Sequence, residues 1–200
     1  MKNIIISALV MSLAVTSCNK KNNVQEDKSL ETKSVVQSKA IPNNENSPKQ
    51  EAVNQKANDY IEDILTGYIN LKNMLAKDDT NGAAEKGKIL FASFNKFDAS
   101  ALNAKQKKEY LDIADDAKEH AEHIGLNGGN IPHQREHFAS LSKDISDLIT
   151  LLGSNQKLYQ DYCPMYDNGK GAVWISKTKE IENPYFGKKM STCGSIKKEF

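Results

Sequence analysis

Two short stretches near the C-terminus each carry one cysteine and one methionine. Cys163 and Met165 are separated by a single proline, and Met190 and Cys193 lie three residues apart. Residues two apart share a face of an extended segment, and residues three apart share a face of a helical turn. Each stretch can therefore present one thiolate and one thioether in the same direction. Such donors select soft metals, copper(I) above all.

The same residues have a plainer interpretation, which their spacing leaves open. In an exported protein, Cys163 and Cys193 could form a disulfide rather than bind a metal. Closing a loop of about 30 residues would stabilise the fold by about 3–4 kcal/mol in the chain-entropy model. Met165 and Met190 would then be ordinary filling of the hydrophobic core.

Four histidines form two closely spaced pairs. His133 and His137 are four residues apart, so they share one face of a predicted helix and could hold a metal together; a solvated helix edge is the alternative. His120 and His123 lie at the end of the preceding helix, where they could serve only to complement the helix dipole. Because a short loop joins the two helices, all four histidines should lie near one end of the fold.

The first 17 residues have the organisation of a secretory signal. Lys2 supplies a positive charge, Ile4 to Val15 form a short apolar stretch, and small residues lead to Cys18. The apolar stretch is too short to span a bilayer, which needs about 20 residues. The pattern predicts a lipoprotein in which acylated Cys18 becomes the N-terminus and anchors the chain to a membrane. A plain secretory signal with an incidental cysteine is the alternative.

The rest of the chain predicts a mainly α protein. Residues 18–50 are polar and carry no aromatic residue, which predicts a disordered tether behind the lipidated cysteine. Residues 51–153 show apolar positions in steps of three and four, which predict a four-helix antiparallel bundle or, alternatively, two less regularly packed hairpins. Residues 154–200 predict a small β-hairpin, with its turn at 167–171, and a short helix packed on the bundle.

Composition and motifs exclude several classes of function. The chain has 27 basic and 26 acidic residues, and this balance provides no strong basic field for binding nucleic acid. The sequence lacks the motifs of zinc peptidases, di-iron bundles, serine hydrolases, phosphate-binding loops and Cys-x-x-Cys oxidoreductases. We do not expect an enzyme; the remaining enzymatic alternative uses Cys163 as a nucleophile, without an identifiable orienting triad.

Several motifs resemble those of a known family. They are His-Gln-Arg-Glu-His-Phe-Ala-Ser-Leu-Ser at 133–142, Tyr-Cys-Pro-Met at 162–165, Trp-Ile-Ser at 174–176, and Asn-Pro-Tyr-Phe-Gly-x-x-Met-x-x-Cys-Gly at 183–194. Together they are similar to a domain-of-unknown-function family over about residues 55 to 197. Its members occur as lipoproteins of Gram-negative bacteria. They also occur fused to the C-terminus of periplasmic adaptor subunits of heavy-metal efflux pumps.

This resemblance implies a role in copper or silver efflux. We expect a lipid-anchored protein of the inner or outer membrane that faces the periplasm and binds copper(I), or alternatively silver(I). It would buffer the metal or hand it to an efflux adaptor. The expected metal ligands, which match the family pattern, are Cys163, Met165, Met190, Cys193, His133 and His137. The alternative function is a structural or protein-interaction module stapled by a disulfide, without metal.

Overall fold

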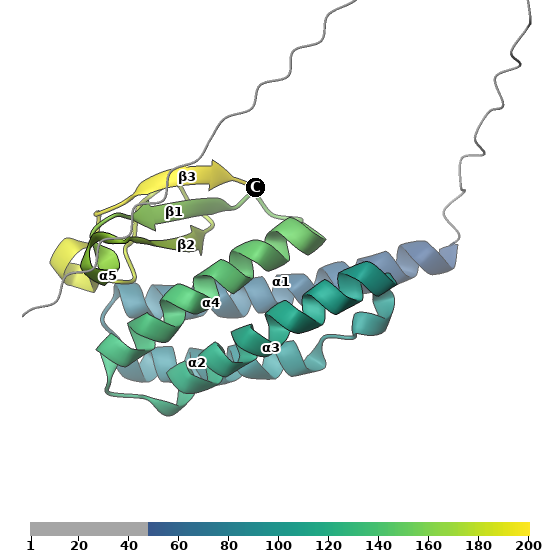
Figure 1. Ribbon diagram of the computed structural model, residues 1–200, viewed down its shortest axis with the longest axis horizontal. Coiled ribbons are helices and arrows are strands. Elements are labelled where there is room, and N and C mark those ends of the chain that lie inside the picture. Colours follow the sequence, from purple (N-terminus) through teal and green to yellow (C-terminus); the bar gives the residue numbers. More distant parts are fainter. Residues whose placement is uncertain (1–47) are drawn as a thin grey trace, which may run out of the picture. The chain divides into compact units, whose positions relative to one another are not determined.

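The computed structural model describes residues 48–200, with side chains described from residue 59 onward. Four long helices precede a small sheet (Figure 1). The helices are α1 (Pro48–Ala76), α2 (Thr80–Lys96), α3 (Ala104–Leu126) and α4 (Ile131–Leu152). Across residues 48–200, none of the helices combines the length and apolarity needed to cross a bilayer. The predicted signal peptide, Cys18 and nearly all of the predicted tether lie outside the described residues.

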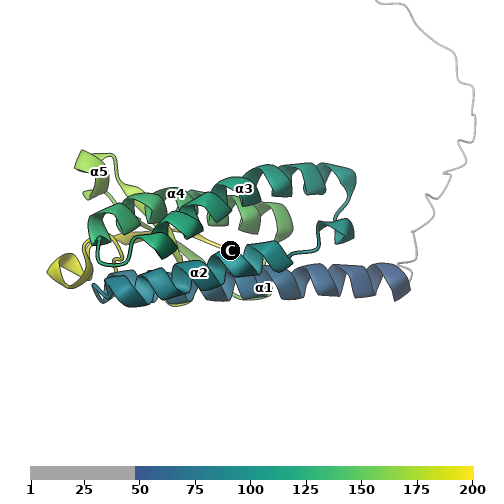
Figure 2. The same ribbon diagram turned by 90° about the horizontal axis from the view of Figure 1, so that it is seen from below.

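The predicted helical bundle is confirmed. Helix α2 packs along α1 and α3, and α3 packs along α4 (Figure 2). The apolar stripes of the four helices meet in one continuous hydrophobic core. Buried members from each helix are Ile64, Tyr68, Leu71, Leu90, Phe94, Ala114, Ala121, Phe138, Leu141 and Ile145.

Local chemistry sets the ends of the two helices that carry the histidines. Helix α3 begins with a capping box, in which Asn103 and Gln106 accept hydrogen bonds from each other's backbone N–H groups. Asn130 caps the start of helix α4, where its side chain accepts a hydrogen bond from the backbone N–H of His133. Gly153 caps the other end, with a φ of +81° that favours glycine. The α3–α4 hairpin therefore has well-defined ends.

Glycines allow close contacts between neighbouring helices. A Cβ at Gly87 of α2 would lie 2.9 Å from the carbonyl oxygen of Ala121 on α3. On α1, a Cβ at Gly67 would lie 3.3 Å from Cδ1 of Leu90. Helix α1 continues through Gly67 without a break. These glycines therefore allow the helix backbones to approach, which offsets their poor helix propensity.

The C-terminal segment forms the predicted hairpin and adds a third strand. Strand β1 (Tyr159–Cys163) lies between β2 (Ala172–Ser176) and β3 (Ser195–Glu199), and both pairings are antiparallel (Figure 1). Two short helices lie in the connections, α5 (Tyr166–Gly169) and η2 (Gly187–Met190). The sequence did not predict β3, because it is a largely exposed edge strand rich in charge, without the alternation of a half-buried strand.

The sheet is attached to the bundle through α1 and α4. Strand β2 packs against α4. The Tyr68 hydroxyl accepts a hydrogen bond from the backbone N–H of Ile175 at 3.1 Å and lies 2.7 Å from the Ser142 hydroxyl. Gln160 of β1 donates from its side-chain amide to the Ser146 hydroxyl at 2.7 Å. These polar contacts fix the register of the sheet on the helices.

Candidate metal centre

Three imidazole rings converge where α3 and α4 lie side by side. His123, His133 and His137 each offer a ligand atom, and these atoms lie within 4.8 Å of one another. The ring of His137 stacks on that of His123 with centroids 4.3 Å apart, and the ring of His133 lies edge-on to His137 at 4.6 Å. Small side-chain movements would bring the three nitrogen donors onto one metal ion.

A fourth imidazole adjoins this group. Nδ1 of His120 lies 3.1 Å from Nδ1 of His137, so one of the two nitrogens donates a hydrogen bond to the other. This bond would leave Nε2 of His137 as its metal-binding nitrogen. Metal-binding histidines almost always use their second ring nitrogen in such a hydrogen bond, which fixes the ring orientation. We call the four residues His120, His123, His133 and His137 the histidine cluster.

The antiparallel α3–α4 hairpin explains this convergence. His123 and His133 are almost equidistant from Gly128 in the connecting loop, and so are His120 and His137. The expectation that all four histidines lie near one end of the fold is therefore confirmed. His120 and His123 do more than complement the helix dipole, because both rings contact the ring of His137 on α4. Equidistance from the loop is the sequence signal that could have identified the whole cluster.

Electrostatics favour the neutral form of two histidines of the cluster, His120 and His137. Burial lowers the pKa of His120, an effect that the carboxylates of Glu119 and Asp116 oppose. Burial also lowers the pKa of His137, and the other three histidines of the cluster lower it further. Neutral imidazole is the form that binds metal. The rings of His120 and His137 are therefore neutral at neutral pH.

Arg135, between the two histidines of α4, fixes this turn of the helix to other parts of the fold. Its guanidinium donates to the carbonyl oxygens of Pro184 at 2.7 Å and Leu75 at 3.0 Å, and pairs with Asp78 at 2.7 Å. A Cβ at Gly187, where φ is +53°, would overlap the Asp78 carboxylate and this guanidinium. The arrangement holds the start of α4, the α1–α2 turn and the C-terminal segment together.

Beyond the histidine cluster, carboxylates of α3 and α4 lie near one another. Burial, together with the nearby carboxylates of Asp116 and Asp147, raises the pKa of Asp144 to about 7. The Oδ2 atom of Asp144 is buried and has no hydrogen-bond partner within the described part of the chain. Ionised Asp144 therefore opposes folding.

An Asp144→Asn variant should be more stable than the parent protein at about pH 8. Because the pKa is raised on folding, the native state binds more protons than the unfolded state between the ordinary carboxyl range and about pH 7. The carboxyl group therefore costs stability progressively as pH rises through that window. After allowance for solvent screening, we expect the free energy of unfolding to rise by about 1–2 kcal/mol at pH 8.

Urea unfolding at about pH 8 and about pH 4 tests this prediction. At the lower pH most of the gain should vanish, because Asp144 is then protonated in the folded state and partly protonated in the unfolded state. The exposed Asp63 provides the control, since Asp63→Asn should change stability little at either pH. An equal gain at both pH values would contradict the assigned cause.

The two tail cysteines meet at the end of the sheet. Sγ of Cys163 lies 3.6 Å from Sγ of Cys193, and both are free thiols in the structure. Cys163 is fully buried at the end of β1, whereas Cys193 is partly exposed. The side-chain amide of Asn183 donates to the carbonyl oxygen of Cys193 at 2.6 Å and holds this loop in place. Hydrogen bonding to Cys163 and burial raise the pKa of the Cys193 thiol.

The two predicted methionine ligands lie on segments outside the strands. The extended segment expected to run through Met165 ends at Cys163, because the chain turns at Pro164 and Met165 has helical φ and ψ. Met165 is therefore 54% exposed and does not share a strand face with Cys163. Met190 ends η2 and is partly buried, and its carbonyl oxygen accepts a hydrogen bond from the Cys193 N–H at 3.1 Å.

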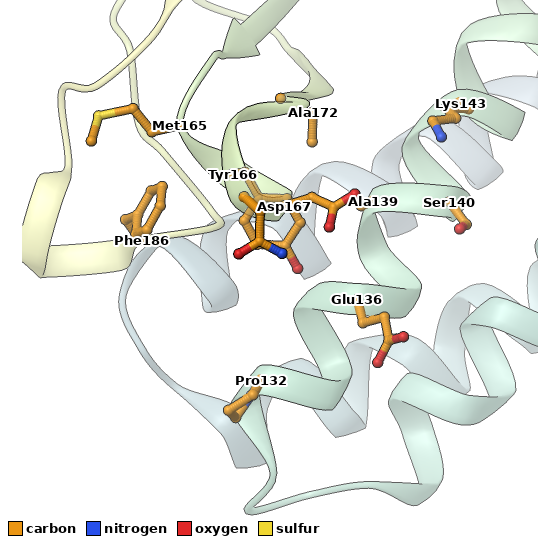
Figure 3. Close-up of a pocket in the computed structure, with 12 residues that line it drawn as sticks. Pro132, Glu136, Ala139, Ser140, Lys143, Met165, Tyr166, Asp167, Ala172 and Phe186 are labelled. Atoms are coloured by element: carbon orange, nitrogen blue, oxygen red, sulfur yellow. The ribbon is translucent and has the colours of Figure 1, made fainter. Parts of the chain in front are cut away.

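Met165 lines a pocket of about 630 Å³ between α4 and the turn that contains α5. Figure 3 shows Met165 and Phe186 on one side of this pocket and Glu136 and Lys143 on the α4 side. Asp167, in a left-handed backbone conformation, lies between them. None of the lining residues is a cysteine or a histidine, so this pocket is distinct from both the cysteine pair and the histidine cluster.

The cysteine pair and the histidine cluster lie on different sides of α4. The sheet that carries Cys163 packs against α4 through β2, whereas α3 lies along another side of α4 (Figure 1). The histidine cluster joins α3 to α4. The expected ligands therefore fall into two groups, one of sulfur and one of nitrogen donors. Imidazoles suit copper, zinc and nickel, whereas thiolates suit copper(I).

Comparisons with known proteins give one positive finding. Residues 64–157 match the model of a family described as protein of unknown function (DUF3347). This region contains most of the bundle and all four histidines, and it ends before the two cysteines. No curated protein and no solved structure matches the chain significantly.

Proposed function

We propose that this chain, whose residues 64–157 match the model of the DUF3347 family, is a copper-binding protein. The histidine cluster would hold the metal through His123, His133 and His137, with His120 orienting His137. The Cys163–Cys193 pair would provide a second, softer site for copper(I). Met165, which lines a separate pocket, and Met190 remain candidate thioether ligands.

One observation carries the proposal: the convergence of three imidazoles from two helices, with their ligand atoms within 4.8 Å of one another. Three histidines are a recognised ligand set for a transition metal with an open position. Packing four imidazoles together without a metal brings no comparable gain, because they carry polar nitrogens and repel one another when protonated. Metal binding would turn this arrangement into a stabilising one.

Copper is the metal that best fits both groups of donors. Among divalent first-row metals, copper(II) forms the most stable complexes with a given set of nitrogen ligands. Copper(I) in turn prefers thiolate and thioether sulfur. A chain with an imidazole group on one side of α4 and a thiol pair on the other could therefore bind the metal in either oxidation state. Silver(I) would compete only at the sulfur group.

The proposed location follows from the N-terminal sequence. A lipid on Cys18 would hold the protein at the periplasmic face of a membrane, and the segment up to residue 50 would let the domain reach a partner. In that position it could buffer copper or deliver it to a periplasmic efflux adaptor. Exchange of the metal would be helped by the partial exposure of His123, His133 and His137.

Titration of copper(II) into the purified full chain tests the proposal. The protein would carry Cys18→Ser and would be oxidised beforehand, so that thiols do not take part. We expect one tightly bound copper(II) per chain, and its loss when His123, His133 and His137 are all replaced by alanine. Circular dichroism would verify that the triple variant keeps its helices. Equal binding by the triple variant would refute the proposed site.

A second candidate function rests on the 3.6 Å distance between the two Sγ atoms. Only a small movement would close a disulfide between Cys163 and Cys193, since a disulfide holds its sulfurs about 2 Å apart. The protein would then be an anchored interaction module whose C-terminal segment is stapled to β1. That function predicts an intact disulfide in protein isolated without reductant, and no copper uptake by the histidine cluster.

A further inference from the structure

We propose that Cys163 and Cys193 form a redox site that reduces copper(II) to copper(I). The inference rests on the proposed copper-binding function and adds an activity to it. A thiol pair that converts to a disulfide releases two electrons, and copper(II) is the oxidant that the proposed function brings to the protein. The pair would thus set the oxidation state of the copper that the protein handles.

The geometry favours formation of a disulfide between these two thiols. Their sulfurs lie 3.6 Å apart, although the residues are far apart in the sequence. The surrounding structure brings them together: Cys163 ends a strand paired on both sides, and Asn183 holds the Cys193 backbone at 2.6 Å. Oxidation therefore needs little rearrangement of the fold.

The two cysteines differ in access to solvent, and this difference assigns them separate roles. Cys193 is partly exposed and can meet a copper ion from solution. Cys163 is 0% exposed, so it cannot reach a thiol of another molecule and is available only to Cys193. Cys193 is thus the thiol that contacts copper, and Cys163 is the one that completes the disulfide.

The reaction balances with copper(II) as the only oxidant. Each thiol loses its proton and the pair loses two electrons, while one S–S bond forms between Cys163 and Cys193. Two copper(II) ions accept one electron each and become copper(I). The products are one disulfide, two copper(I) ions and two protons. The reduced pair can bind copper(I), but the disulfide offers no thiolate, so the copper(I) formed in this reaction moves to other soft ligands.

The test uses the full chain with Cys18→Ser, reduced and freed of reductant under anaerobic conditions. Copper(II) is added together with bicinchoninate, which traps copper(I) and reports it by colour. We expect two copper(I) ions per chain, a monomeric product, and a mass lower by two hydrogens. Formation of no copper(I), or of a product that consists of disulfide-linked dimers, would overturn the proposal.

Single-thiol variants provide the matched controls. Cys163→Ser leaves only the exposed thiol of the pair, and Cys193→Ser leaves only the buried one. Neither variant can form the intramolecular disulfide. We expect Cys193→Ser to reduce little copper, and Cys163→Ser to yield at most one copper(I) per chain with intermolecular dimers. If either variant matched the parent protein in rate and yield, the paired mechanism would be wrong.

The same experiment separates this inference from the proposed function. The double variant Cys163→Ser plus Cys193→Ser keeps the histidine cluster and should still bind copper(II). If it binds copper(II) while the parent fails to reduce it, the redox inference fails and the copper-binding proposal stands. If the parent reduces copper(II) while the double variant binds none, the proposed histidine site fails and the thiol chemistry stands.

Discussion

A Phe138→Ala variant should lose about 3–5 kcal/mol of unfolding free energy, a large part of the stability of a domain of this size. Phe138 is completely buried. Its ring stacks on Tyr68 of α1 with centroids 5.2 Å apart and lies 5.7 Å from the ring of Tyr185. The substitution would open a cavity where the bundle meets the C-terminal segment.

Urea or thermal unfolding, followed by circular dichroism, measures this loss. The matched control is Leu126→Ala at the end of α3, where the side chain is 72% exposed and its removal should change stability by less than about 0.5 kcal/mol. Equal stabilities for the two variants would contradict the assigned core.

His137→Ala should cause the largest loss of copper(II) affinity among single substitutions in the histidine cluster. The ring of His137 contacts the other three, through stacking on His123, an edge contact with His133 and a hydrogen bond with His120. Its removal takes away a metal ligand and the group that His120 orients. Because loss of an outer partner alone costs about 10–100-fold in metal affinity, we expect a loss of about 100-fold or more.

Competition titrations against a chelator of known affinity give the dissociation constants. Lys143→Ala, on the same helix but outside the cluster, serves as the control and should bind copper(II) like the parent protein. His120→Ala should fall between them, at about 10–100-fold, if His120 acts through His137. A larger loss for His120→Ala than for His137→Ala would reverse the roles assigned to the two residues.

The helical part of the fold could be predicted from the sequence because its signals are local. Apolar steps of three and four residues run through each helix, and Asn130 and Gly153 mark the ends of α4. The third strand could not be predicted, because Ser195–Glu199 alternates neither in polarity nor in burial. It is a strand only because its backbone pairs with β1, a long-range contact that leaves no local pattern.

The candidate site was only partly predictable for the same reason. The i, i+4 spacing of His133 and His137 places them on one helix face, and the hairpin then brings His120 and His123 to them. The approach of Cys193 to Cys163 depends on the path of the loop after β2, which spacing alone does not determine. The prediction for Met165 was wrong for another reason: it extended the strand across Pro164, where the chain turns away.

The electron paramagnetic resonance spectrum of copper(II) bound to the oxidised full chain, with Cys18→Ser, tests the central claim most directly. If the imidazoles of His123, His133 and His137 hold the metal, the spectrum should show hyperfine coupling to several nitrogen nuclei. That coupling should disappear when the three histidines are replaced. A spectrum of hydrated copper(II), or nitrogen coupling that survives in the triple variant, would contradict the account.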